Sequence, residues 1–538
     1  MSGARLRALC VGALIVAVTL AGCGSGSSST SKSAPQVLRL ADEGVQDLAD
    51  VDLDPPAENL GANAIEVISL VFGGLVRLDQ NLRVQPDGAS SWTISPDKRT
   101  YTFHIRKGLK FADGSPVTAE DFAYSLNRAF APQFINGNTD YYLGHIVGGP
   151  EVTNKKAVSI SGVRVINPST LAITTDVPTA AFLDQLSFSA SYVVPKKLIE
   201  QYGKKWTEHA VGTGPFYVKR WQHGKEIDLA PNPYYWRGKP KLSQLRVIFV
   251  QNPDTAYNLY RTGGLDIVGV QTFPPDKLAS ARHEAGFVAI PQLSTQYIPP
   301  NERKAPFDNV RVRRAFSFAI NRDVLVNRFL GGQYTPARGI LPPGMPGYNA
   351  NLTGEIFDPA QAKKELAQAG YPNGQGFPAV TLSYSTGDAG QSALAPVLQR
   401  FWKEYLGVNV ALNGMEAGAY NNLLTARNYQ LAFINWGEDY PDPQDFLSLQ
   451  LQTGAGNNNG SYSDPTFDQL TRRADVLVGN NDRRFQLYQE AEKRALAAAA
   501  WIVLYHGKSA TIINPRVHGV IVNGGGVTAP NWATVTIS

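Results

Sequence analysis

The chain has 538 residues, a formal net charge of +5 at pH 7, and 43% hydrophobic and 18% charged residues. These proportions are typical of a globular protein, and so small and scattered a charge argues against nucleic acid as a partner. A chain of this length usually divides into more than one hydrophobic core.

The first residues have the organisation of an export signal. Arg5 and Arg7 precede an apolar stretch, residues 8–20, which is shorter than the roughly 20 residues of a membrane-spanning helix. The following Leu-Ala-Gly-Cys resembles the lipobox of bacterial lipoproteins. That resemblance implies that residues 1–22 are a lipoprotein signal peptide and that Cys23 is lipidated after cleavage. A secreted protein with an incidental cysteine is the alternative.

Residues 23–36 form a Gly/Ser-rich run, which predicts a flexible tether. No later stretch approaches 18 consecutive apolar residues, so we expect no transmembrane helix. Cys10 and Cys23 are the two cysteines of the chain. Because one is expected to leave with the signal and the other to carry lipid, internal disulfides, cysteine-ligated zinc and a cysteine nucleophile are excluded.

Strand and helix patterns alternate along the rest of the chain, which favours α/β lobes. Residues 116–130 predict a helix capped by Thr118, with Asp121 near the capping-box position and an apolar stripe behind it. Residues 100–106 alternate strictly and predict a strand. The apolar face of this strand is expected to comprise Tyr101, Phe103 and Ile105, and the helix stripe Phe122, Leu126 and Ala129.

Two further segments carry clear local signals. Residues 216–230 predict a hairpin that turns at His223-Gly224. Asn309 precedes a helix whose apolar stripe is expected to run from Val312 to Val324 and to end at Gly331-Gly332.

Later in the chain, Asp358-Pro359 predicts the start of a helix, because proline suits the first helical position, and Gly370 its end. Residues 431–436 are a strand-like apolar run. Acidic residues follow it, and a pair of carboxylates flanking a sugar bond is the arrangement that a glycosidase needs. Their spacing is equally explained by a capped loop. The acidic residues concerned are Asp439, Asp442 and Asp445.

Other catalytic and metal-binding signatures are missing from the sequence. It contains neither His-Glu-x-x-His nor Gly-x-Ser-x-Gly, and its seven histidines are dispersed. We therefore predict no catalytic residue, no metal site and no cofactor, and we do not expect an enzyme.

Six ordered blocks together resemble the family 5 group of bacterial extracellular solute-binding proteins, which serve peptide and nickel ABC transporters. The longest block, from Gln85 to Ser125, is close to the family signature over its whole length. The other blocks are residues 211–218 with 232–236, 264–267, 305–315 with 319–322, 362–370, and 436–443. The resemblance implies an α/β fold of the two-lobed periplasmic-binding-protein type II class (cluster C), with an extra subdomain inserted in the first lobe.

By analogy with that family, the domain boundaries can be placed on this chain. Lobe I is expected to comprise residues 37–76, 183–294 and 506–538, and the inserted subdomain residues 77–182. Lobe II is expected at residues 295–505. A ligand would bind between the lobes, which close on it by hinge motion.

The resemblance implies the receptor component of an ABC importer for short peptides. Such a protein works as a monomer, docks on the permease subunits, and touches the membrane through its N-terminal lipid alone. Its place is the periplasmic side or the outer face of the cytoplasmic membrane. The same role for a nickel complex, haem, an opine or an oligosaccharide stays open. An exported glycosidase and a signalling surface protein are the alternatives of another class.

The resemblance also implies ligand-binding residues in the block 436–443. In related peptide binders an aspartate of this block pairs with the peptide's terminal ammonium, and the matching residue here is Asp439. Capping of the local turn is the alternative role. Trp436 and Tyr440 flank this residue and are expected to wall the pocket, with core packing as the alternative. Glu438 stands where the family usually has alanine, and an extra carboxylate favours a cationic ligand group.

Overall fold

The computed structural model describes residues 36–43, 53–57, 62–134, 139–270, 272–352, 354 and 356–538. The predicted signal peptide and Cys23 lie outside these residues, so both stay predictions. The compact unit begins at Gln36, whose side-chain amide pairs with the backbone N–H of Ile537 at 2.7 Å. Within the described ranges, no helix has both the length and the apolar character that crossing a membrane requires.

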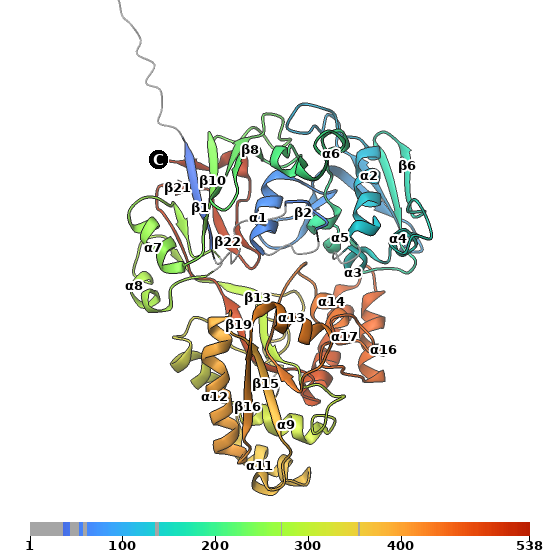
Figure 1. The fold of residues 1–538 in the computed structure, drawn as a ribbon. Coiled ribbons are helices and arrows are strands. Elements are labelled where there is room, and N and C mark those ends of the chain that lie inside the picture. The colour runs from blue at the N-terminus through green and yellow to red at the C-terminus, as the bar shows by residue number, and fades with distance from the viewer. Residues whose placement is uncertain are drawn as a thin grey trace, which may run out of the picture. The chain divides into compact units, whose positions relative to one another are not determined.

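A seven-stranded sheet is built from segments that lie far apart in the sequence (Figure 1). Strand β1 lies at its centre, parallel to β10 and β11. The predicted hairpin is confirmed, because β8 and β9 pair up to Gln222 and Glu226, with Gly224 at φ 72° in the turn. In sheet order the strands are β12 (Phe287–Val288), β20 (Thr511–Ile513), β11 (Ile267–Val268), β1 (Val37–Glu43), β10 (Gln244–Val250), β9 (Glu226–Pro231) and β8 (Phe216–Gln222).

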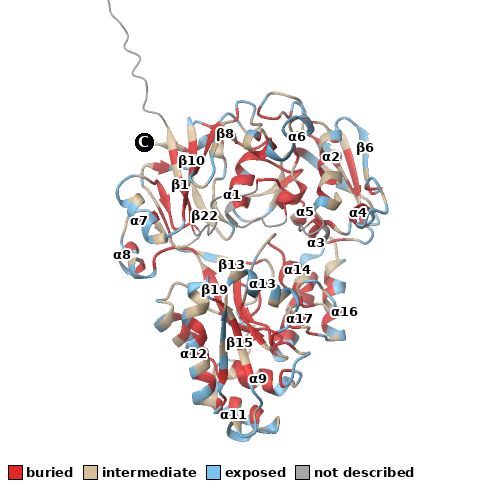
Figure 2. Ribbon diagram, in the orientation of Figure 1, coloured by how far each residue is buried: buried red, intermediate tan, exposed pale blue. Residues whose placement is uncertain are grey.

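Two helices pack against this sheet in separate apolar cores. Helix α1 (Ala62–Val71) buries Val67, Ile68 and Val71 against side chains of β1 and β10 in one apolar core. Helix α7 (Pro253–Arg261) packs near β1 and β10 in a smaller core. Buried residues lie along strands β1 and β10 of this sheet (Figure 2).

A separate four-stranded antiparallel sheet, here called the insert sheet, has the order β4-β5-β7-β6. The predicted strand is confirmed as β5 (Thr100–Ile105), whose three apolar side chains are buried while His104 is exposed. The predicted helix is confirmed as α2 (Ala119–Ala129), where the Thr118 N–H donates to Asp121 at 2.8 Å. Its predicted stripe is buried. The other strands are β4 (Ala89–Ile94), β6 (Val163–Asn167) and β7 (Thr170–Thr174).

Two more sheets form the core of the chain between residues 291 and 508. The first, here called the central sheet, has the order β14 (Thr335–Pro336), β19 (Ile502–Lys508), β13 (Pro291–Ile298) and β18 (Ile434–Gly437). The second has the order β16 (Val410–Met415), β15 (Val380–Ser385) and β17 (Leu431–Ala432). The helices around them are α9 (Val310–Phe318), α11 (Pro359–Gln368), α12 (Ala389–Leu406), α16 (Pro465–Asp475) and α17 (Asn481–Ala497).

Helix α11 confirms the prediction made from Asp358 and Gly370. The Asp358 carboxylate accepts the Gln361 N–H at 2.9 Å, and Gly370 follows the helix with φ 96°.

Two boundary predictions were wrong. The helix after Asn309 does not continue to Gly331, because α9 ends at Phe318 and α10 (Arg322–Val324) and a π-helical turn (Leu325–Phe329) follow. The buried Arg322 guanidinium explains this break, since it donates to the Ser317 and Val503 carbonyls at 3.3 and 2.5 Å.

The apolar run 431–436 is likewise not one strand. It divides at Phe433 into β17 and β18, which belong to different sheets. Asp439 nevertheless lies two residues after the end of the second of them, β18.

The chain passes twice between the seven-stranded and the central sheet. It leaves the former after Val288 and enters the latter at Pro291, and it returns between Lys508 and Thr511. The two passages lie side by side, because the Ser509 N–H donates to the Ile290 carbonyl at 2.9 Å.

Candidate functional site

The turn after β18 lies where the elements around the insert sheet meet those around the central sheet. Tyr142, from helix α3 (Thr139–Leu143), donates its hydroxyl to the Asp439 carboxylate. Close by, the Gln185 amide donates to Gln444 Oε1 at 3.1 Å, and the Ala180 N–H donates to the Asp475 carbonyl at 2.7 Å. Residues far apart in sequence therefore converge on this turn.

Asp445 fixes the turn from beneath. Its Oδ2 accepts the Asp439 N–H at 3.1 Å and the Trp436 indole N–H at 3.2 Å, and the residue is fully buried. Its Oδ1 has no hydrogen-bond partner. The cap of the following helix α14 (Pro443–Phe446) is Asp442, which accepts the Gln444 N–H at 2.9 Å. The capping role proposed as the alternative for Asp439 is thus filled by a neighbour.

Three carboxyl groups share this site, and burial dominates their titration. Burial raises the pKa of Asp439 to about 6, although the Tyr142 hydrogen bond acts in the opposite sense. Burial, with a smaller contribution from Asp439, also holds the pKa values of Glu438 and Asp445 well above the usual range. Buried carboxylates that act on one another in this way favour a bound cation, because it would stabilise their ionised forms.

The two aromatic neighbours of Asp439 have different surroundings. Trp436 is half-buried and packs against the core that contains Leu487 and Trp501. Tyr440 is fully buried, with its ring edge-on to Tyr142 at 6.0 Å between centroids and its hydroxyl donating to Gln444 at 3.2 Å. These contacts favour the packing role for Tyr440, and a ligand contact by either ring stays a prediction.

Glu438 lies between two parts of the chain. Its backbone N–H donates to the Leu293 carbonyl at 2.9 Å. Its carboxylate lies beside Gly525, where an added Cβ would sit 3.6 Å from Oε1. Gly525 is in the tight turn between β22 (Ile521–Asn523) and β23 (Gly526–Thr528). Glu438 is therefore placed next to the C-terminal hairpin as well as next to Asp439.

A buried ion pair stands behind the site. The Arg484 guanidinium donates to the Asp442 carboxylate, and their side chains are 3% and 4% exposed. Asp184, from α5 (Phe182–Gln185), faces the same pair, and burial followed by the Asp442 charge raises its pKa to about 7. Asp442 and Asp445 thus both have structural partners, which does not favour a pair of glycosidase acids. Among the described residues, no three His, Cys, Asp or Glu side chains converge to hold a metal.

Sequence reasoning missed Tyr142, Gln185 and Arg484. Each is placed at the site by tertiary packing, since Tyr142 and Asp439 are 297 positions apart. The stretch around Tyr142 has no periodic pattern or family block that would have marked it.

The fold and site define a two-lobed type II periplasmic binding protein. The structure of the murein tripeptide binding protein MppA of Escherichia coli superimposes with a TM-score of 0.77, at 27% identity, over 94% of this chain and 99% of that one. The model of the bacterial extracellular solute-binding proteins, family 5, matches residues 83–458. The chain belongs to this family, and the predicted family and fold class are both confirmed.

Two curated relatives extend the comparison over nearly the whole chain. The periplasmic oligopeptide-binding protein OppA of Salmonella typhimurium is 31% identical over 94% of this chain and 95% of its own length. The oligopeptide-binding protein OppA of Bacillus subtilis is 29% identical over 86% of each. Both relatives are oligopeptide-binding proteins by name.

Proposed function

We propose that this protein is the substrate-binding component of an ABC importer for short peptides. It captures a peptide between lobe I (37–76, 183–294 and 506–538, with the insert 77–182) and lobe II (295–505), then delivers it to a membrane permease. It works as a monomer, catalyses no reaction, and stays on the outer side of the membrane through a lipid on Cys23. Membership of family 5 and the resemblance to oligopeptide-binding relatives support this proposal.

The observation that carries the proposal is the Asp439 carboxylate. Its backbone is held by Asp445, and the partner of its side chain is a hydroxyl that comes from the insert side of the chain. A peptide's terminal ammonium is a stronger, charged donor than a phenol, so it displaces Tyr142 and forms a buried ion pair. The extended backbone of the bound peptide, lying next to β18, then forms hydrogen bonds with the protein that do not depend on the peptide's side chains.

A thermal-shift comparison of trialanine with N-acetyl-trialanine on the full-length chain tests this proposal. Free trialanine is expected to raise the melting temperature, because a ligand that binds the folded state stabilises it by mass action. The acetylated peptide, which has no ammonium, is expected to give no shift at the same concentration. Equal shifts with the two peptides would contradict an ion pair between the peptide ammonium and Asp439. A shift with a sugar panel, nickel–histidine or haem, and none with peptides, would show that the ligand is not a peptide.

Peptide affinity is expected to weaken in acid. The ammonium pairs with ionised Asp439, whose pKa burial raises to about 6. Affinity should be full above about pH 7 and fall by up to about tenfold per pH unit as the pH drops below about 6. The titratable groups that face Asp439 are Glu438, Asp445 and Tyr142, and burial raises the pKa values of the two carboxyl groups well above their usual range.

Calorimetric titration across this range checks the pH prediction. The raised pKa of Asp439 favours folding at acid pH, and this contribution is lost as the pH rises through about 6. Protonation of Asp439 therefore does not unfold the unliganded protein, and a matched melting curve separates binding from unfolding. A flat affinity profile from about pH 5 to about pH 8 would contradict an ion pair at Asp439.

A further inference from the structure

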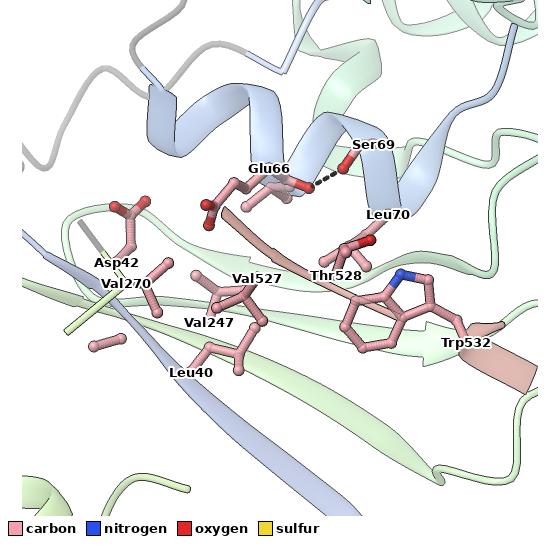
Figure 3. Close-up of a pocket in the computed structure, with 12 residues that line it drawn as sticks. Leu40, Asp42, Glu66, Ser69, Leu70, Val247, Val270, Val527, Thr528 and Trp532 are labelled. Carbon is pink, nitrogen blue, oxygen red and sulfur yellow. Dashed lines mark hydrogen bonds between the residues drawn. The ribbon is translucent and has the colours of Figure 1, made fainter. Parts of the chain in front are cut away.

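A second acidic site lies in lobe I, in a cavity of about 40 Å³ between helix α1 and the seven-stranded sheet (Figure 3). The carboxyl groups of Asp42 and Glu66 lie at one end of it, and Trp532 lies at the other. Between them the wall is apolar, formed by Leu40, Val67, Leu70, Val247, Val270 and Val527.

Asp42 is the unusual member of this cavity. The residue is 5% exposed, and both of its carboxylate oxygens are buried without a hydrogen-bond partner. Burying a carboxylate in this way costs several kcal/mol unless a counter-charge or donor is supplied. The adjacent Glu43 has partners, because it accepts the N–H groups of Gly269 and Thr272 at 2.6 and 3.2 Å. Asp42 therefore lacks the hydrogen-bond donors that its neighbour Glu43 has.

Glu66 adds a second acid from the facing helix. It is partly exposed, and the neighbouring lining residue Ser69 is exposed, so this side of the cavity reaches the surface. Burial raises the pKa of Asp42 to about 7, with a contribution from Glu43, and that of Glu66 to about 8, with contributions from Asp42 and Glu43. The charged groups that act on Asp42 and Glu66 are thus acidic too, and a bound cation would stabilise the ionised forms of both carboxyl groups.

The cavity lies close to the Asp439 site. Glu438 is next to Gly525, and Glu66 is next to Gly526, where an added Cβ would fall 2.7 Å from Oε1. Gly525 lies in the turn between β22 and β23 and Gly526 is the first residue of β23, and adjacent Cα atoms are about 3.8 Å apart. One turn of the chain therefore separates the two acidic sites.

We propose that this cavity binds an aliphatic ammonium group, with the nitrogen between Asp42 and Glu66 and its methylene groups against the apolar wall. A cavity of about 40 Å³ has room for about three water-sized groups, since one water needs about 10–15 Å³. An ammonium nitrogen with the two or three carbons next to it matches this room and this distribution of charge, and the rest of a longer chain continues toward the exposed side of the cavity at Ser69. The ammonium comes either from a free alkylamine or from a lysine side chain of a bound peptide. The lysine source rests on the proposed function, whereas the free amine does not.

Butylamine and its neutral isostere 1-butanol, titrated against the full-length chain, test the cavity without any peptide. Butylamine is expected to bind at least about tenfold more weakly to Asp42→Asn and to Glu66→Gln than to the native protein. Butanol should bind all three alike. The matched control is Glu120→Gln, which neutralises an exposed acid in the first turn of α2 and should change nothing. Asp42→Asn removes an unpaired buried charge, so it is expected to fold.

The pH dependence of butylamine binding to the native protein tests the same site without any substitution. Butylamine affinity should rise between about pH 6 and about pH 9, as Asp42 and Glu66 ionise next to the neighbouring acid Glu43, while butanol affinity stays constant. Amine binding that equals butanol binding, or that neither substitution weakens, would overturn the proposal and leave a water-filled cavity.

The peptides Ala-Lys-Ala and Ala-norleucine-Ala distinguish the two sources of the ammonium. A preference for lysine that Asp42→Asn abolishes assigns the cavity to a peptide side chain. Amine binding that depends on Asp42, without any effect on the peptide preference, assigns it to a free amine. If neither peptide binds, the proposed function fails, and the butylamine titration alone decides the cavity.

Discussion

Replacing Asp439 with alanine is expected to weaken tripeptide binding by two to three orders of magnitude or more, while the unliganded protein melts at its native temperature or slightly above. Removing one partner of a buried charge pair typically costs about 2–5 kcal/mol, of which each 1.4 kcal/mol is tenfold. The unliganded fold loses little, because the carboxylate has a tyrosine hydroxyl as its partner and its raised pKa shows that burial already disfavours its ionised form. Calorimetry with trialanine and a melting curve without ligand measure the two effects.

Tyr142→Phe is the matched control for this substitution. It removes the hydroxyl that occupies Asp439 and keeps the ring that packs against Phe188 and Tyr440. Trialanine binding should be retained or strengthened, because the ammonium no longer displaces a donor. If Asp439→Ala clearly lowers the melting temperature of the unliganded protein, the loss of binding reflects a less stable fold, and the role of Asp439 is structural.

Replacing Arg484 with methionine is expected to lower the free energy of unfolding by about 3–5 kcal/mol. The substitution leaves the carboxylate of Asp442 buried without its counter-charge, and Asp184 close beside it. Urea denaturation followed by tryptophan fluorescence measures the change.

The neighbouring Arg483 supplies a control on the same helix. It is 45% exposed and its ion pair with Glu490 is at the surface, so Arg483→Met should change stability by less than about 0.5 kcal/mol. The double variant Arg484→Met with Asp442→Asn should recover part of the loss, since it removes the unpaired charge. Equal small effects at both arginines would show that the buried pair contributes little.

Local signals were sufficient for the elements that carry their own caps and stripes. The Thr118 and Asp121 capping box placed α2, Asp358-Pro359 placed α11, and strict alternation placed β5. Helix α9 could not be bounded in this way, because its end depends on Arg322 reaching a carbonyl of β19, which lies far away in the sequence. The split of residues 431–436 between two sheets likewise depends on which strands lie alongside.

The site was predictable only through family resemblance. The block 436–443 pointed to Asp439, whose ligand contact stays a prediction, and the structure shows that Asp445 holds the backbone of this residue. Tyr142, which donates its hydroxyl to Asp439, reaches the site through tertiary packing, and nothing in the sequence around it predicts this contact. The lobe I cavity is similar in this respect, because Asp42 reads in the sequence as an ordinary strand end and its isolation depends on α1 and β23 closing around it.

The seven-stranded sheet also dictates an order of assembly. Strand β12 joins that sheet only through β20, which is among the last segments to leave the ribosome, whereas β1 is among the first. The central sheet and the sheet of β15, β16 and β17, by contrast, are formed by one stretch of chain, residues 291–508. These two sheets are thus free to complete their own pairing first, while the seven-stranded sheet keeps an open edge at β11 until the C-terminal segment arrives. The seven-stranded sheet, whose central strand is synthesised early, is therefore the sheet that waits for the C-terminal segment, whereas the insert sheet can pair without it.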